Sequence, residues 1–350
     1  MKKIVFKTLL LGLIFFVNNM LLFAQEINKK HTNRFRIMFY NVENLFDTED
    51  DPKKKDEEFL PKGNRFWTKY KYWDKEKRIY KVITAVGGWE PPDIIGVCEI
   101  ENRKVITDLV NNTPLVKFNY QIVHKESPDK RGIDVGFLYR KETFTLIDKK
   151  FLPINFPFSP NSKTRDILYA KGITNSKDTL HIFINHWPSR WGGQLESEPR
   201  RVFVASVLRH SIDSLINISK KTNIIIAGDF NDEPNNNSIV KILQASSKVN
   251  NIQNDKLYNL SGYIQENKNA ASHKYQGVWG MLDQFIVSGY LLNQTNSITT
   301  GINDVHIFKA NFLMEKDEAY YGFKPKRTFV GFKYNDGFSD HLPVYLDLFY

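Results

Sequence analysis

The stretch NIIIAGDFNDEP, residues 223–234, carries the pattern that decides the fold. Its four consecutive apolar residues, 224–227, are typical of a strand that is buried on both faces. Asp229 and Asn231 follow, and because alternate side chains of an extended chain share a face, they are expected to point the same way. A carboxylate and a carboxamide at the mouth of a buried strand suit a water or a phosphate oxygen. An ordinary Asp/Asn turn before the proline is the alternative.

Other strand-like runs also place a polar residue at one end. The runs that finish in a polar side chain end at Asn41, Glu99 and His186, and those that start with one begin at Asp134, Asp283 and the pair Asp340 and His341. If the second group of strands runs opposite to the first, all of these side chains meet at one sheet edge. Each alone is ordinarily structural, but their joint placement indicates a functional site.

Helices and strands alternate early in the chain, and strands dominate later. Apolar residues at i, i+3, i+4 and i+7 predict an amphipathic helix over 74–86, capped by Asp74 and ended by two glycines. Further helices are expected over 102–110, 203–215 and 238–243, and strands over 35–40, 93–100, 120–124, 134–139, 144–147, 168–171, 180–185, 282–287 and 342–348. No repeat or linker divides the chain, so residues 25–350 are expected to form one α/β domain with two packed sheets.

Residues 1–24 have the pattern of a secretory signal peptide. Three lysines precede an apolar segment over 9–23, and Ala24 offers a cleavage point. A membrane anchor is the alternative, but the apolar run is short and contains two asparagines. We therefore expect export to the periplasm or the extracellular space, with no transmembrane segment after cleavage.

The composition favours an anionic partner. The formal net charge is +10, and a basic surface attracts nucleic acid or anionic headgroups, although it also serves plain solubility. The aromatic and basic stretch 42–72 is a candidate for gripping nucleic acid, with packing of its aromatic residues onto the surface as the alternative. The loop 190–201, with Arg190, Arg200 and Arg201, is a candidate for contacting a substrate backbone, with a local pair of Glu198 and Arg201 as the alternative. Cys98 is the only cysteine, which excludes an intramolecular disulfide and predicts a small core residue. No stable protein partner is evident, and a monomer is expected.

The polar set suits metal-assisted hydrolysis. Asn41, Glu99 and Asp340 offer oxygens of the kind that a hard cation such as Mg²⁺ or Mn²⁺ prefers, with Ca²⁺ as a further candidate. His341 with a carboxylate partner, for which Asp283 is the candidate, can act in acid–base chemistry. The sequence has no HExxH motif, P-loop, GxSxG elbow or dinucleotide fingerprint that would favour another chemistry.

These residues lie in motifs that resemble those of the endonuclease/exonuclease/phosphatase superfamily, whose fold is the deoxyribonuclease I-like four-layer α/β sandwich. The matching motifs are FYNVENLFD (39–47), IIGVCEIEN (94–102), RGIDVGFLYR (131–140), INHWPSRWGG (184–193), IAGDFNDEP (226–234), LDQF (282–285) and SDHLP (339–343). They follow the order of the family and span nearly the whole chain after residue 24.

The resemblance implies a metal-dependent phosphoric ester hydrolase. It implies metal binding by Glu99, helped by Asn41 and Asp340. It also implies that Asp229 positions or activates the attacking water and that Asn231 stabilises the transition state.

The resemblance further implies a set of phosphate-side groups. His341, held by Asp283, would contact the scissile phosphate. His186 would be a second histidine on the phosphate side, oriented by an acid for which Asp134 is the candidate. Arg165 stands where some members place an arginine that contacts phosphate. The division of acid and base roles between the two histidines varies among members and stays open.

We expect a nuclease that hydrolyses DNA or RNA phosphodiester bonds by attack of an activated water. A phosphodiesterase or phosphatase acting on lipid headgroups, as sphingomyelinases do, or on inositol phosphates is the alternative. A membrane-acting enzyme should show an exposed apolar hairpin, and the sequence shows no clear one. A non-catalytic binding protein is disfavoured because the polar set is complete.

Overall fold

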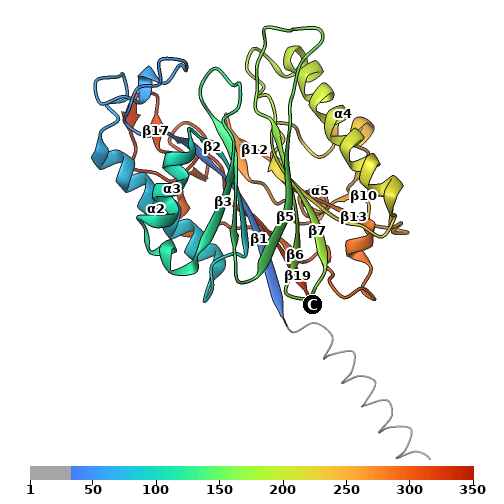
Figure 1. Cartoon of the computed structure of the whole chain (residues 1–350). Coiled ribbons are helices and arrows are strands. Elements are labelled where there is room, and N and C mark those ends of the chain that lie inside the picture. The colour runs from blue at the N-terminus through green and yellow to red at the C-terminus, as the bar shows by residue number, and fades with distance from the viewer. Residues whose placement is uncertain (1–32) are drawn as a thin grey trace, which may run out of the picture.

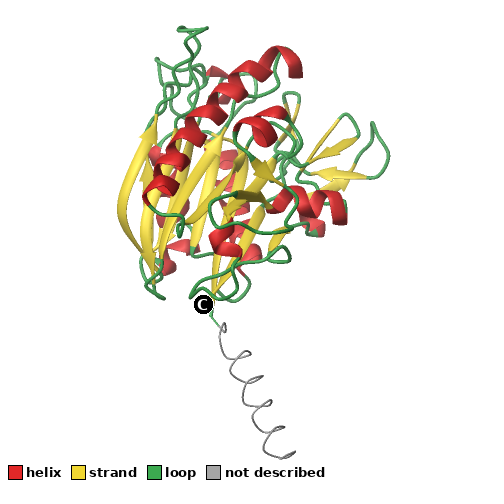
Figure 2. Cartoon of the chain, turned by 90° about the vertical axis from the view of Figure 1, so that its right-hand side faces the viewer, coloured by secondary structure: helices red, strands yellow, loops and turns green. Residues whose placement is uncertain are grey.

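The computed structural model describes residues 33–350, which form two β-sheets packed face to face with helices over their outer faces (Figures 1 and 2). This is the expected four-layer α/β sandwich. The expected signal peptide lies outside the described residues. Within residues 33–350, no helix is long and apolar enough to cross a membrane.

The first sheet has six strands in the order β14-β19-β1-β2-β4-β3. Their bounds are β1 (Arg34–Leu45), β2 (Ile94–Ile100), β3 (Tyr120–His124), β4 (Asp134–Arg140), β14 (Val305–Ile307) and β19 (Val344–Phe349). Strands β1 and β2 are parallel, whereas β4 and β19 run antiparallel to them.

The second sheet has seven strands in the order β5-β6-β7-β8-β13-β10-β9. Their bounds are β5 (Phe144–Leu152), β6 (Ile167–Thr174), β7 (Thr179–His186), β8 (Asn223–Asp229), β9 (Ala245–Ser246), β10 (Leu257–Asn259) and β13 (Asp283–Ser288). Strands β7 and β8 are parallel, and β13 runs antiparallel to β8.

The strands that begin with a polar residue run opposite to those that end in one, as a shared polar edge requires. Their polar ends therefore share one edge of the sandwich. The C-terminus lies beside the start of β1, because Arg34 pairs with Phe349. It is at the bottom of Figure 1, so the polar edge is at the top.

Alternation along each strand separates the layers. In β1, Phe35, Ile37 and Phe39 face the second sheet, whereas Met38 and Tyr40 face the helices. The helices are α2 (Lys69–Gly87) and α3 (Arg103–Asn111) over the first sheet, α4 (Gln194–Ile218) over the second, and α5 (Leu260–Lys268) (Figure 1). The buried free thiol of Cys98 lies in the core between the sheets, as expected.

Two helix boundaries differ from expectation. Helix α2 begins at Lys69, so Asp74 lies inside it and pairs with Arg78 one turn later at 2.7 Å, and does not cap it. Helix α4 begins at Gln194, so most of the expected loop 190–201 is helical. Arg201 is fully buried there and pairs with Asp232 at 2.7 Å, which keeps it from any substrate.

Three short hairpins were not predicted from the sequence. They are β11–β12 (His273–Tyr275 and Val278–Gly280), β15–β16 (Met314–Lys316 and Phe323–Pro325) and β17–β18 (Phe329–Val330 and Lys333–Tyr334). Tyr275, Val278, Tyr321 and Phe323 are exposed on or beside the first two, so the structure contains exposed apolar hairpins that the sequence did not show clearly. Strands of two or three residues are too short for a periodic pattern to reveal.

The aromatic stretch 42–72 is divided between core and surface. Trp67 is fully buried and donates its indole N–H to the Phe46 carbonyl at 2.8 Å, and Tyr72 is also buried. Phe66 and Tyr70 remain exposed. Much of this stretch therefore packs onto the first sheet, as the alternative interpretation held.

Candidate active site

Glu99 reaches the site because β2 bulges just before it ends. Cys98 and Ile100 pair with two consecutive residues of β4, Val135 and Asp134, so Glu99 between them has no pairing partner in β4. Its φ of 61° is left-handed, which is costly for a residue with a side chain. A bulge re-aims one side chain. The carboxylate of Glu99 is thereby turned toward the ends of the neighbouring strands.

A tight turn after β8 positions Asp229 and Asn231. The Oδ1 atom of Asp229 accepts the backbone N–H of Asn231 at 2.9 Å, and Asn231 has a left-handed φ of 51°. The extended geometry expected from the sequence therefore stops at Asp229. Gly228 is needed before the turn because a Cβ there would lie 2.5 Å from the carbonyl oxygen of Asn185.

The ends of β1, β2, β7 and β8 supply one polar cluster. The Nδ2 atom of Asn41 lies 3.4 Å from Glu99 Oε1 and 3.1 Å from Asp229 Oδ2. The Nε2 atom of His186 lies 3.8 Å and 3.7 Å from the same two oxygens. The structure thus brings together four side chains that the sequence singled out separately.

His341 enters this cluster from the loop before β19. Its Nδ1 lies 2.7 Å from Asp283 Oδ2, so the expected pair is present, and its Nε2 lies 3.9 Å from Asp229 Oδ2. The hydroxyl of Ser339 accepts the His341 backbone N–H at 3.0 Å and donates to the Asn41 carbonyl at 2.7 Å. This hydroxyl fixes the loop against the end of β1.

Burial and neighbouring charges shift the pKa values of Asp229, His341 and His186 in different directions. Burial raises the pKa of Asp229 to about 7, with Asp283 acting in the same direction and His341 opposing. Burial alone would lower the pKa of His341, but the carboxylates of Asp283 and Asp229 raise it well above its ordinary value. Burial, with Arg165 nearby, lowers the pKa of His186 well below its ordinary value. At neutral pH, His341 is therefore protonated and His186 is neutral.

Asp134 does not orient His186, which corrects the expectation. Its carboxylate binds His124 Nε2 at 2.9 Å and accepts the Ser127 backbone N–H at 2.8 Å. The Nδ1 atom of His186 is buried and has no hydrogen-bond partner among residues 33–350. Asp134 does begin β4 at the polar edge, but its partners are His124, at the end of the paired strand β3, and Ser127, in the connection between the two strands.

Arg165 lies beside the cluster and is joined to it through a shared carbonyl. Its Nη1 pairs with Asp129 at 2.9 Å, and its Nη2 donates to the Trp187 carbonyl at 2.6 Å. The same carbonyl accepts Asn231 Nδ2 at 3.0 Å. Arg165 therefore helps to position Asn231, and its direct contact with phosphate stays a prediction.

Asp340 belongs to a charge network that sequence reasoning missed and that runs from the surface, where Arg327 is exposed, to the buried Glu43. It pairs with Arg327 at 3.1 Å, and Arg327 pairs with Glu43 at 3.0 Å. Burial and the Asp340 carboxylate raise the pKa of Glu43 to about 7, while burial lowers the pKa of the nearby Lys75 to about 8. Glu43 stands in the motif 39–47, which was the available signal. The metal-binding role of Asp340 stays a prediction.

His273 is a second residue that the sequence did not single out. Its ring lies 4.6 Å from that of His341, and the two residues form a bridge between backbone segments. Burial, together with the charge on His341, lowers the pKa of His273 to about 4. A neutral imidazole therefore covers the charged one.

The donor set fits a divalent cation. Glu99 Oε1 and Asp229 Oδ2 approach the same atoms of Asn41 and His186, and in the described part of the chain neither carboxylate pairs with Lys or Arg. The resulting surplus of negative charge is what a cation would neutralise, and carboxylate oxygens are ligands of hard cations. Asn41 turns its Nδ2 toward these carboxylates while its Oδ1 accepts the Glu43 backbone N–H at 2.9 Å, so its role as an oxygen ligand stays a prediction. The ligand atoms of Asp229, Asp283 and His341 also lie within 4.8 Å of one another.

Comparison with known proteins places this site in a family. The model of the Endonuclease/Exonuclease/phosphatase family matches residues 36–349. The chain belongs to this family. Its members are metal-dependent phosphoric ester hydrolases, and the geometry above carries the polar set that such chemistry requires.

Solved structures share the fold at low sequence identity. An endonuclease/exonuclease/phosphatase family protein from Bacteroides thetaiotaomicron has a TM-score of 0.56 at 13% identity, covering 91% of this chain and 98% of its own. A mannosyl-6-phosphatase from the same species has a TM-score of 0.55 at 13% identity, covering 90% and 100%. TDP2 from D. rerio, complexed with a single strand DNA product, has a TM-score of 0.53 at 12% identity, covering 90% and 99%. No curated protein sequence matches the chain.

Proposed function

We propose that the chain is an exported, Mg²⁺- or Mn²⁺-dependent nuclease. The polar cluster supports hydrolysis of a phosphate ester, and one observation favours nucleic acid as the substrate. Arg131, Lys163 and Arg200 are exposed in a pocket next to the cluster, and no Asp or Glu lines that pocket. A concentration of unpaired positive charge beside a phosphate-ester site suits a substrate with several phosphates. Export rests on the signal-peptide pattern of residues 1–24.

The residues divide the work of hydrolysis according to their protonation states. With a pKa of about 7, Asp229 can accept a proton from the attacking water near neutral pH. Protonated His341 donates to a phosphoryl oxygen as negative charge develops there. The amide of Asn231 uses one N–H for the Trp187 carbonyl and keeps the other for the substrate. A cation held by Glu99 and Asn41 would supply Lewis acidity at the phosphate.

A substrate panel tests the proposal. The purified protein with Mg²⁺ or Mn²⁺ should degrade plasmid DNA or RNA, and EDTA should abolish the activity. Asp229→Ala and His341→Ala should be inactive, whereas Asp255→Ala, at a surface carboxylate that pairs with Lys220, should keep full activity. If DNA and RNA survive while bis(p-nitrophenyl) phosphate is hydrolysed, the nuclease assignment is wrong and the phosphodiesterase chemistry stands.

A lipid phosphodiesterase is the second candidate, and the exposed hairpins favour it. Tyr275, Val278, Tyr321 and Phe323 are 61–102% exposed on two hairpins that a Lys274–Asp317 ion pair joins. Exposed aromatic residues of this kind anchor proteins at a membrane interface. Hydrolysis of sphingomyelin in vesicles, lost on replacing Tyr321 and Phe323 by Ser, would support this candidate over the nuclease.

A further inference from the structure

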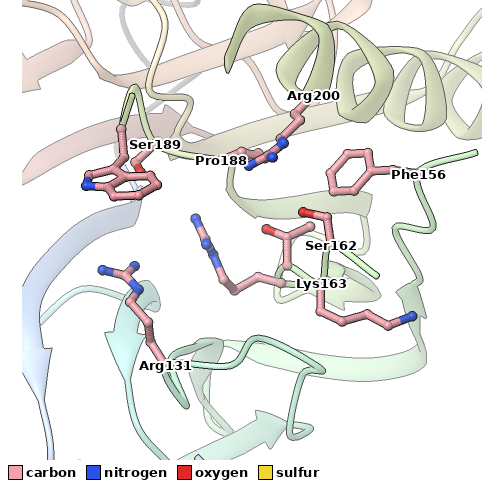
Figure 3. A pocket seen from close by; sticks show the side chains of 10 residues that line it. Arg131, Phe156, Ser162, Lys163, Pro188, Ser189 and Arg200 are labelled. Atoms are coloured by element: carbon pink, nitrogen blue, oxygen red, sulfur yellow. The ribbon is translucent and has the colours of Figure 1, made fainter. Parts of the chain in front are cut away.

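A pocket of about 410 Å³ adjoins the polar cluster, and the catalytic groups do not use it. Its walls come from the turn before β4, the segment before β6 and the beginning of α4 (Figure 3). Arg165 lines it and connects it to the cluster, because Arg165 and Asn231 donate to the same Trp187 carbonyl. A group bound in this pocket would therefore lie next to a phosphate bound at the cluster.

The pocket collects positive charge, and within residues 33–350 only that of Arg165 is paired, with Asp129. Figure 3 shows Arg200 reaching from α4 toward the middle of the pocket and Arg131 extending along the opposite side, with the amine of Lys163 pointing away from both. Among residues 33–350, neither Arg131 nor Arg200 forms a side-chain hydrogen bond or an ion pair, and both are exposed. Two like charges that face one space repel each other unless an anion lies between them.

The floor of the pocket adds buried donors that lack acceptors. Thr164 is 3% and Arg165 6% exposed, and both line the pocket. The hydroxyl of Thr164 and the Nε atom of Arg165 are buried and have no hydrogen-bond partner in the part of the chain that the structure describes. Burying an unsatisfied donor is costly, so such groups ordinarily have a ligand or a water to bind.

We propose that this pocket binds a second phosphate of the same substrate, namely the backbone phosphate next to the one that is cleaved in a nucleic acid strand. The proposal rests on the nuclease function proposed above. The planar guanidinium groups of Arg131 and Arg200 match the oxygens of a phosphate and do so bidentately. Trp191 is 89% exposed and borders both this pocket and the apolar pocket that Asn231 lines. A base can stack on it between the two phosphates.

Matched dinucleotides test the second-phosphate subsite. TpT carries the scissile phosphate alone, whereas pTpT and TpTp each add a second phosphate on one side. The wild-type protein should hydrolyse one of the two phosphorylated compounds with a kcat/KM about tenfold or more above that of TpT. In the double variant Arg131→Ala/Arg200→Ala this preference should fall to about one, and Arg131→Lys/Arg200→Lys should keep part of it.

The control replaces two exposed lysines at the opposite end of the second sheet. Lys177→Ala/Lys221→Ala removes the same charge from a different pocket, so both the preference and the activity should remain. Because Arg131 and Arg200 are exposed and unpaired, the double alanine variant should keep the wild-type thermal midpoint. Equal hydrolysis of TpT, pTpT and TpTp by the wild type would overturn the subsite and leave the nuclease function standing.

Binding without catalysis separates the two proposals. Fluorescence anisotropy of a short labelled single-stranded DNA, in EDTA and across a range of NaCl concentrations, should show a Kd raised about tenfold in the double variant. The slope of log Kd against log salt should fall by about 0.7, since the variant loses one phosphate contact and each such contact accounts for about 0.7 on single strands. An unchanged Kd and slope would overturn the subsite. If the double variant loses affinity for DNA but the wild-type protein does not cleave DNA, the subsite stands and the nuclease function is rejected.

Discussion

Replacing Asp283 by Asn tests whether a buried carboxylate sets the charge of His341. Asp283 is 1% exposed, and its Oδ2 lies 2.7 Å from His341 Nδ1. The amide has the same shape but no charge, so the geometry should persist while the electrostatic support is lost. Asp229, at 3.9 Å from His341 Nε2, is then the main remaining carboxylate that holds the proton there.

The size of the effect follows from the lost interaction. A hydrogen bond to a charged group contributes about 1.5–3 kcal/mol, which corresponds to a factor of roughly 10–150 in rate. We expect kcat/KM at pH 7 to fall by about this factor. Because Asp283 raises the pKa of His341, its removal lowers that pKa, and the alkaline limb of the pH–rate profile should move to lower pH.

Initial rates on bis(p-nitrophenyl) phosphate at saturating Mn²⁺, measured across acidic to alkaline pH, provide the assay. Asp347→Asn is the matched control, because Asp347 is also buried and pairs with Arg36 at 2.6 Å at the other end of the sheet. That control should lose stability and keep the wild-type pH profile. A folded Asp283→Asn protein with wild-type kcat/KM and an unmoved alkaline limb would refute the reasoning.

Three further predictions concern the metal, pH and a buried ion pair. Glu99→Gln should weaken Mn²⁺ binding, measured by calorimetry, by at least about tenfold because it removes a carboxylate ligand; an unchanged affinity would contradict the metal assignment. Burial lowers the pKa of His181 to about 4, below its value near 6.5 in the unfolded chain. Between about pH 6.5 and pH 4 the unfolded chain therefore binds more protons than the folded protein, so the free energy of unfolding falls as the pH drops through this range. Urea unfolding should show a loss of about 2 kcal/mol, after allowance for the partly exposed ring, and His181→Asn should flatten this dependence; equal pH slopes would contradict it. Arg201→Met should cost about 3–5 kcal/mol, because it leaves Asp232 buried and unpaired, and a urea midpoint near that of the wild type would count against this ion pair.

The sequence predicted the long elements and most of the cluster because both depend on local patterns. The apolar run 224–227 and its polar successors identify β8 and Asp229 without any tertiary information. Strand polarity then followed from where the polar residues fall, and the pairing of His341 with Asp283 is present as expected. The hairpin strands of two or three residues carry no period, so they could not be found in this way.

The contacts that decide partners were set only by the tertiary structure. Asp134 was a reasonable partner for His186, yet it binds His124, because the antiparallel pairing of β3 with β4 brings that ring nearer. Arg201 was a candidate surface cation, but α4 buries it against Asp232.

The sequence by itself determined which chemical groups stand at one edge of the sandwich, since that depends on strand periodicity and order. The tertiary structure alone decided that Glu99 turns inward through a bulge and that Arg131 and Arg200 lie on opposite sides of a pocket beside the site. The physical reason is that side-chain partners depend on distances between segments far apart in the chain. Packing sets those distances, and no local pattern records them.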